Sequence, residues 1–425
     1  MMMKKLIALL LVLVLFLPAV TLAEDIDDDW DDDDIEIEPL DPDSYYTDEE
    51  GNLIYKIGSV ELSEEELKKL EDIEAEIELD SSVTVDEDSL CINPNLPDNV
   101  INILLIGVDA RGTKEIQLLK DQIRLDENST GKAISKRSDV IMILSINLDD
   151  GSIKLTSIAR NTYVEIPGRK NKSIIANSFG YAIYEDGKYK SWIDQPWTCV
   201  ATVNKNFGLN IQNFVAINFF GVEEIIESLG GVDIDLTQKE ARAINTYLSK
   251  RKLYNSKGER ISHGTTIANT YDNHSEGRKN LKEKKGVQHL DGLQALMYGR
   301  LRSIDNDFVR TARTRHLLDS LLKPTMARIK KGELDIVNMI ADWSRYFYTQ
   351  MPLSDIATIA SGVLKSLSLS DIESATTMIS EFRIPEDKTY SYQTVDGSSV
   401  TVMNDQRKTT EALHRFIYGE YYPAD

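Results

Sequence analysis

Apolar residues in the middle of the chain fall into runs of strand length. Residues 102–108, NILLIGV, form one apolar run of the kind found in a central strand that is buried on both faces. Residues 140–146 and 153–158 form two more runs, separated by a segment that includes Asp149, Asp150 and Gly151. An Asp-Gly pair is turn chemistry typical of a hairpin. The pattern therefore predicts a buried strand followed by an antiparallel hairpin.

Helical patterns alternate with further short strands along the rest of the chain. Strands are predicted at 214–218 and 232–235, and helices at 199–207, 221–229, 237–247, 291–298 and 308–331. Residues 249–286 are polar and predict a surface insertion or mobile loop. No internal repeat or heptad run occurs after residue 96. The alternation predicts one α/β domain over residues 97–425, with helices on both faces of a mixed sheet.

The first 23 residues have the pattern of an export signal. A short basic start with Lys4 and Lys5 precedes an apolar run over residues 6–17, and Thr21 with Ala23 suits a signal-peptidase site. Residues 6–23 together come close to the length of a membrane span, so an uncleaved anchor remains the alternative. In either case the lysines stay inside and the body lies at the extracellular face of the cell envelope, secreted or anchored.

Charge is concentrated in one segment of the chain. Residues 24–96 carry 29 acidic residues against three lysines, so residues 97–425 have a net charge of +2 although the whole chain has −22. Runs such as residues 31–34, four aspartates, predict a largely disordered linker, with a short helix at 61–79. Calcium binding by this run is the alternative, but the spaced ligands of a calcium loop are lacking. A nearly neutral body lacks the basic face that nucleic-acid binding needs.

Two cysteines, Cys91 and Cys199, are present. Outside the cytoplasm thiols usually pair, so we expect a disulfide that fixes the end of the linker to the body. Two free buried thiols are the alternative.

Charged residues gather where the predicted strands begin and end. Asp109 follows the first strand, Arg137 and Asp139 open the second, and Arg160 follows the third. Residues two apart in an extended chain face the same side. The hairpin brings the start of the second strand and the end of the third to one edge of the sheet. If the first strand is also antiparallel to the second, all four side chains share one crevice.

A second charged group occupies residues 298–315. Arg300 and Arg302 alternate on an extended segment, and Asp307 precedes Arg310 and Arg313, which are one helical turn apart. The arginine fork grips phosphate oxygens, and two aspartates with several arginines predict Mg²⁺ on a phosphate or pyrophosphate. Surface salt bridges are the alternative for any single residue. The sequence has no Walker loop, dinucleotide fingerprint, nucleophile elbow or zinc motif, and its five histidines lack ligand spacing.

At these residues the chain resembles the LytR-CpsA-Psr family of envelope phosphotransferases. The resemblance rests on spaced motifs in family order over residues 102–331, with a closing segment at 332–425: NILLIGVDARG, RSDVIMILSIN, LTSIARNTYVEIPG, IIANSFGYA, FVAINFFGVEEIIESLGGVDID, GVQHLDGLQALMYGRLR and DNDFVRTAR. It implies an α/β/α sandwich with a central mixed sheet and an apolar lipid-binding pocket. It also implies metal binding by Asp109 and Asp139, and pyrophosphate binding by Arg137, Arg160, Arg300, Arg302, Arg310 and Arg313.

The resemblance implies transfer of a teichoic acid, capsule or related glycopolymer from undecaprenyl pyrophosphate to peptidoglycan. Arg160, Arg300 and Arg302 would then be catalytic, with Mg²⁺ as cofactor, and Asp307 would accept the proton of the acceptor hydroxyl. The expected partners are the lipid-linked glycopolymer, the peptidoglycan acceptor and the membrane surface, without nucleic acid. One alternative is a non-catalytic protein that binds polyprenyl phosphate. A transcriptional regulator is the other, and export with a nearly neutral body argues against it.

Overall fold

The structure is a computed structural model that describes most of the region after residue 61. Longer described stretches are residues 62–76, 87–108, 137–149, 152–180, 194–250, 278–301, 333–366, 379–395 and 397–424. Shorter pieces are residues 45–47, 53–55, 184–185, 188–189, 253–254, 260–261 and 266–267, together with scattered positions between 313 and 331. The export signal and the aspartate run at 31–34 lie outside the described residues. Within those residues, no helix combines the length and apolarity needed to cross a membrane.

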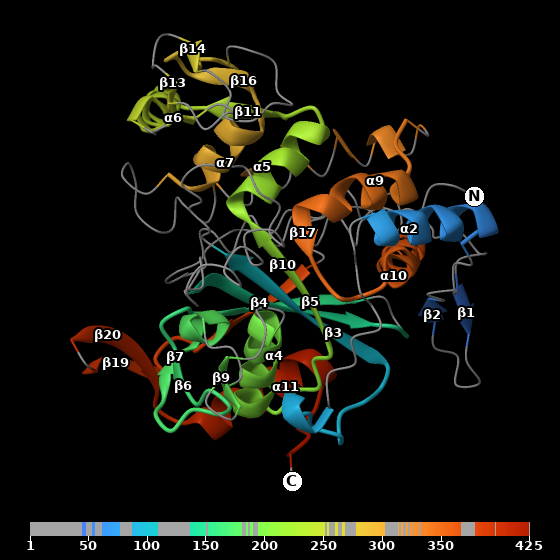
Figure 1. Ribbon diagram of the computed structural model, residues 1–425, viewed down its shortest axis with the longest axis vertical. Coiled ribbons are helices and arrows are strands. Elements are labelled where there is room, and N and C mark those ends of the chain that lie inside the picture. The colour runs from blue at the N-terminus through green and yellow to red at the C-terminus, as the bar shows by residue number, and fades with distance from the viewer. Residues whose placement is uncertain are drawn as a thin grey trace.

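A six-stranded mixed sheet forms the centre of the molecule, in the order β17-β10-β3-β4-β5-β18 (Figure 1). Its middle consists of β3 (Val100–Val108), β4 (Ser138–Asn147) and β5 (Ile153–Ile158). β4 is antiparallel to both neighbours. The predicted buried strand and hairpin are therefore confirmed, and the condition that the first strand runs antiparallel to the second is met.

Strands from distant parts of the sequence complete the sheet. β10 (Asn213–Asn218) lies parallel to β3, and β17 (Phe347–Tyr348) pairs with β10 in antiparallel fashion. The outermost strand on the other side of the sheet is β18 (Ile379–Ile384), which is parallel to β5. The closing segment thus contributes a strand that sequence patterns did not locate. The ends of β3, β5, β10 and β18 and the starts of β4 and β17 consequently share one edge.

Helices cover both faces of the sheet (Figure 1). On one face, α4 (Asp194–Phe207) and α11 (Gln406–Tyr418) pack with the 3₁₀ helix η3 (Ile175–Gly180). The other face is covered by α5 (Phe219–Ser228), α9 (Ile336–Trp343) and α10 (Leu353–Ser366). The alternating side chains of β3 divide between the two cores. Ile103 and Leu105 pack in the core on the α5 side, and Leu104 and Ile106 pack in the core on the α4 side. The predicted α/β/α sandwich is confirmed.

A smaller group of elements lies beyond α5, at the top of Figure 1. β11 (Val232–Leu236) pairs with β16 (Gly286–Leu290), beside α6 (Gln238–Lys250) and α7 (Gly292–Gly299). Within the polar stretch 249–286, described residues form two short strand pairs. The remaining elements are β1 (Tyr45–Thr47), β2 (Leu53–Tyr55), η2 (Glu87–Leu90), β6 (Tyr163–Val164), β7 (Ser173–Ile174), β8 (Tyr184–Glu185), β9 (Lys188–Tyr189), β12 (Leu253–Tyr254), β13 (Arg260–Ile261), β14 (Thr266–Ile267), β15 (Arg278–Lys279), η4 (Ser344–Tyr346), β19 (Tyr390–Val395) and β20 (Ser398–Met403).

The end of the acidic segment is folded onto the body, which corrects part of the linker prediction. The helix expected at 61–79 is present as α2 (Glu64–Glu76), and Leu70 on it is fully buried in the core shared with α9 and α10. The Glu74 carboxylate accepts a hydrogen bond of 2.5 Å from the Leu353 backbone nitrogen, at the start of α10. A carboxylate at a helix N-terminus is favoured by the helix dipole. Acidic composition therefore did not prevent docking, because one buried leucine and one helix cap fix α2.

The buried imidazole of His414 joins α11 to the turn after α4. Its Nε2 donates to the Phe207 carbonyl oxygen at 2.9 Å, and its Nδ1 accepts from the Tyr422 backbone nitrogen at 3.3 Å. Burial lowers the pKa of His414 below its ordinary 6.5, although these backbone hydrogen bonds partly oppose the shift. The folded protein therefore holds a neutral ring.

Because the folded pKa is depressed, we predict that the stability contributed by His414 is complete above pH 6.5 and falls as the pH drops through the folded pKa. Urea unfolding between pH 7.5 and pH 5 should show this loss. His414→Gln keeps a nitrogen donor for Phe207 but does not titrate, so its unfolding free energy should depend less on pH. An equal pH dependence in both proteins would contradict the prediction.

Candidate functional site

Arg137 and Arg160 both lie at the edge where β3 and β5 end and β4 begins. Arg137 directly precedes β4, and Arg160 follows β5 by two residues. Both side chains are exposed. The 3₁₀ helix η3 connects the two segments: the Ala176 backbone nitrogen donates to the Arg160 carbonyl oxygen at 3.1 Å, and the Asn177 Oδ1 accepts from the Arg137 Nε at 3.0 Å. The two segments that carry these arginines therefore adjoin at one edge of the sheet.

Asn177 gives Arg137 a defined orientation. While its oxygen accepts from Arg137, its Nδ2 donates to the Ser173 hydroxyl at 2.9 Å. An amide with both ends engaged has one orientation, so it holds the guanidinium fork in a fixed plane. No site role was predicted for Asn177 from the sequence, because only the folded chain shows that its partner is an arginine 40 residues away.

A β-bulge places Asp139 at the start of β4. Gly107 pairs with Val140 whereas Val108 pairs with Ser138, which leaves Asp139 as the extra residue. Bulges re-aim side chains and are frequent next to active sites. A Cβ atom on Gly107 would lie 2.6 Å from the Val140 Cβ, so the glycine of the NILLIGV run is required by close strand approach. The backbone of Asp139 thus lies beside the end of β3, as predicted.

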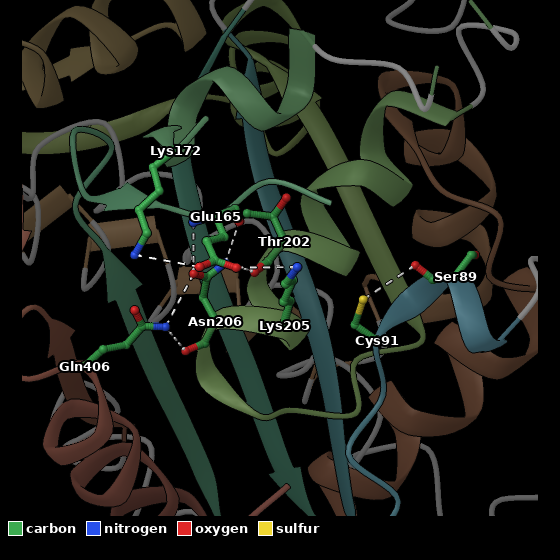
Figure 2. Close-up of polar contacts among 8 residues, drawn as sticks. All are labelled: Ser89, Cys91, Glu165, Lys172, Thr202, Lys205, Asn206 and Gln406. Atoms are coloured by element: carbon green, nitrogen blue, oxygen red, sulfur yellow. Dashed lines mark hydrogen bonds and ion pairs between the residues drawn. The ribbon is translucent and has the colours of Figure 1, made fainter. Parts of the chain in front are cut away.

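The segment after Arg160 is braced by a polar network (Figure 2). Asn206 on α4 accepts from the Glu165 backbone nitrogen at 3.1 Å and donates to the Glu165 carbonyl oxygen at 2.7 Å. Gln406 on α11 donates to the Asn206 carbonyl oxygen at 2.9 Å, and Lys205 lies 3.4 Å from the Glu165 carboxylate. The buried amide of Asn206 thereby substitutes for a neighbouring strand. The loop that carries Arg160 is consequently fixed to two helices.

The second predicted arginine group is described only in part. Arg300 is the C-cap of α7, half-buried, with its backbone nitrogen bonded to the last turn of that helix. Asp109, Arg302, Asp307 and Arg310 lie outside the described residues, as does the side chain of Asp139. Their site roles therefore stay predictions.

Arg313 corrects the sequence prediction. Its side chain is 1% exposed, and its Nε lies 2.9 Å from the Glu240 Oε1, while its Nη1 donates to the Leu301 carbonyl oxygen at 3.1 Å. A phosphate cannot reach a guanidinium that is enclosed in this way. The one-turn spacing from Arg310 did not reveal which side of the helix packs on α6.

The expected disulfide is absent, because Cys91 and Cys199 are both free thiols. Cys91 lies beside the Ser89 carbonyl oxygen, 4.0 Å from it (Figure 2). Its neighbour Leu90 accepts a hydrogen bond of 2.9 Å from Asn204 on α4. Asn204 is more than one helical turn from Cys199. The end of the acidic segment therefore packs on α4 at a different level from the second thiol.

Cys199 belongs to a buried polar cluster behind the edge. Its Sγ lies 3.1 Å from the Ser178 hydroxyl, and Ser138 is also fully buried. Burial raises the pKa of Cys199 to about 12, although hydrogen bonds with Ser178 and Ser138 oppose the shift. A buried thiol of this kind is chemically inert. Among the described residues, no group of three His, Cys, Asp or Glu side chains is placed to bind a metal ion.

The LytR_cpsA_psr family model matches residues 58–409. The chain belongs to the LytR_cpsA_psr family. This range includes the docked helix α2, the whole sheet and the edge that carries Arg137 and Arg160. The resemblance found in the spaced motifs is therefore confirmed.

Relatives in the LytR_cpsA_psr family carry names that describe a transferase. A protein of Bacillus cereus named polyisoprenyl-teichoic acid–peptidoglycan teichoic acid transferase TagU is 25% identical over 225 residues, 51% of this chain and 57% of the relative. TagU of Oceanobacillus iheyensis is 31% identical over 140 residues, 33% of this chain and 35% of the relative. The chain thus spans about half the length of the Bacillus cereus relative that it matches.

Two of the similar solved structures are named as Tag proteins. Bacillus subtilis TagV is 17% identical with a TM-score of 0.43, covering 77% of this chain and 100% of that one. TagT bound to LI-WTA is 17% identical with a TM-score of 0.40, covering 79% and 93% respectively.

Proposed function

We propose that this protein transfers a glycopolymer from polyprenyl (undecaprenyl) pyrophosphate to peptidoglycan. The observation that carries the proposal is that Arg137 and Arg160 lie at one sheet edge, beside the bulge that carries Asp139. Membership of a family with relatives named as teichoic acid transferases supports a transferase. Two arginine side chains on one edge suit a doubly charged phosphate ester better than a neutral ligand.

In the proposed reaction a hydroxyl oxygen of the acceptor attacks the phosphorus that bears the glycopolymer. A new P–O bond forms, the P–O bond to the bridging oxygen of the pyrophosphate breaks, and polyprenyl phosphate leaves with the electron pair. The proton of the hydroxyl passes to a carboxylate, for which Asp307 is our candidate. Charge grows on the leaving phosphate, where arginines can stabilise it. Arg137 and Arg160 supply this stabilisation, together with Arg300 and Arg302.

The donor set fits Mg²⁺. Carboxylates and substrate phosphate oxygens are its preferred ligands, and the Asp139 backbone lies beside the end of β3 that Asp109 follows. These two aspartates would hold the ion, which would neutralise charge on the phosphate oxygens. The pyrophosphate would still be oriented by the arginines proposed above, Arg137, Arg160, Arg300 and Arg302.

The proposed substrates also require a location outside the cytoplasm. A basic start, an apolar run and a small-residue cleavage site support export, and the acidic segment would separate the membrane from the body. An apolar pocket for the polyprenyl chain would lie beside the arginine edge.

Transfer can be tested with the purified full chain, a synthetic polyprenyl-pyrophosphate disaccharide and peptidoglycan glycan fragments. We predict release of polyprenyl phosphate and a glycan product with added disaccharide phosphate, both seen by mass spectrometry and both lost in EDTA. Asp139→Asn should leave only a slow residual reaction that responds little to Mg²⁺. If the lipid binds but no polyprenyl phosphate is released, the result would favour the alternative of a non-catalytic binding protein and overturn the proposal.

A further inference from the structure

We infer that Arg313 is a positioning residue that fixes the backbone between Arg300 and Arg302. This inference rests on the proposed function, because it assigns those two arginines to the pyrophosphate. Arg313 itself is enclosed, with a side chain that is 1% exposed. Its role is exerted through its hydrogen bond to the Leu301 carbonyl oxygen, in the chain between the other two.

The contact falls on the residue between the two arginines. The Arg313 Nη1 donates to the carbonyl oxygen of Leu301 at 3.1 Å. The Leu301 side chain is 5% exposed and packs in the core on the α5 side of the sheet. A buried side chain and an engaged carbonyl restrict both ends of this residue. The Leu301 backbone, from which the chain continues to Arg302, is therefore held from the inside of the protein.

The Arg313 guanidinium is held by a second, independent contact. Its Nε lies 2.9 Å from the Glu240 Oε1, and its carbon lies 5.7 Å from the centre of the Tyr298 ring. A guanidinium is planar and carries its donors in a rigid fork. Fixing Nε on Glu240 thus also fixes the direction in which Nη1 donates.

Glu240 is fixed in turn by the start of α6. Its Oε2 accepts from the Thr237 backbone nitrogen at 2.9 Å and from the Thr237 hydroxyl at 2.8 Å. The Glu240 backbone nitrogen donates back to that hydroxyl at 3.2 Å, which completes a capping box. One carboxylate therefore caps α6 with one oxygen and orients Arg313 with the other. Contacts run without a gap from the helix start to the Leu301 carbonyl.

Displacement of a binding group by about 1 Å can reduce catalysis on the order of 100-fold. Removing the Leu301 contact should therefore weaken pyrophosphate binding although Arg313 never touches the ligand. Arg313→Lys is the appropriate substitution, because lysine keeps a cation for Glu240 but cannot extend a fork to Leu301 as well.

We expect Arg313→Lys to weaken the affinity for polyprenyl pyrophosphate on the order of 10- to 100-fold, measured by calorimetry on the full chain. Transfer should lose a similar factor, mainly through KM for the lipid. Arg328→Lys is the matched control, since Arg328 also donates to a backbone carbonyl, that of Leu229 at 2.7 Å, and pairs with a glutamate. It should retain wild-type affinity.

A double-mutant cycle with Arg302→Ala separates positioning from loss of stability. If Arg313 acts through Arg302, Arg313→Lys should cost little further affinity once Arg302 is absent, whereas general destabilisation would cost the same in both backgrounds. Equal losses in both backgrounds, or wild-type affinity in Arg313→Lys, would overturn the inference alone. Should Arg313→Lys not fold, Glu240→Gln, which keeps an oxygen for Nε, takes its place in the cycle. Wild-type protein that neither binds nor cleaves the lipid would overturn the proposed function, and the role of Arg313 with it.

Discussion

Arg160→Ala is expected to slow glycopolymer transfer by about 100- to 1000-fold, the loss typical of removing one fixed group that stabilises charge in the transition state. Arg160 lies at the meeting point of three strand ends, and its loop is held by η3 and by Asn206. A guanidinium on so rigid a support does not need to be reoriented when charge develops on the leaving phosphate. The measurement is the initial rate of polyprenyl phosphate release at saturating Mg²⁺.

Folding should survive this substitution, because the hydrogen bond that ties Arg160 to Ala176 comes from its backbone and the side chain is exposed. Circular dichroism and the urea midpoint should therefore match the wild type. Arg169→Ala, at another exposed arginine of the same region, is the control and should transfer at the normal rate. A wild-type rate in Arg160→Ala would show that the reaction does not take place at the sheet edge that carries Arg137 and Arg160.

The central strands could be predicted from the sequence because a buried strand and a hairpin turn have strong local patterns. The mostly apolar run of seven residues at 102–108 and the Asp-Gly turn sufficed for β3, β4 and β5, and the pairing then placed Arg137 and Arg160 at one edge. β18 was not located, because an edge strand that pairs with β5 from more than 200 residues away has no local sign of its partner.

Side-chain roles were harder to predict than strand positions. The bulge at Asp139 depends on how β3 approaches β4 at Gly107, which is a contact between strands and not a property of either sequence. Arg313 was assigned to phosphate because arginine type and spacing indicate chemistry but not burial. Its partner Glu240 is 73 residues away. The Thr237-x-x-Glu240 pattern was a readable capping signal, and it would have placed the carboxylate at the start of α6.

The buried pair of Glu240 and Arg313 should dominate the stability of the smaller group of elements. Glu240→Ala leaves a guanidinium that is 1% exposed without its carboxylate, and breaking such a pair costs about 3–5 kcal/mol of unfolding free energy. Burial raises the pKa of Glu240, but hydrogen bonds from Thr237 and Arg313 outweigh it and hold the pKa below its usual range. The contribution is therefore complete above about pH 4.5 and is lost as the pH falls through the lower folded pKa. Urea unfolding at pH 7 and pH 4 measures both effects.

Replacing both partners together separates stability from positioning. Glu240→Leu with Arg313→Met removes the two charges along with their desolvation cost, and such apolar replacements are often neutral or stabilising. We expect this double variant to regain most of the unfolding free energy lost in Glu240→Ala. Its affinity for polyprenyl pyrophosphate should remain low, because a methionine cannot donate to the Leu301 carbonyl. A double variant as unstable as Glu240→Ala would show that the pair stabilises the fold beyond mutual neutralisation. One that is stable and binds normally would show that the Leu301 contact does not position the arginines.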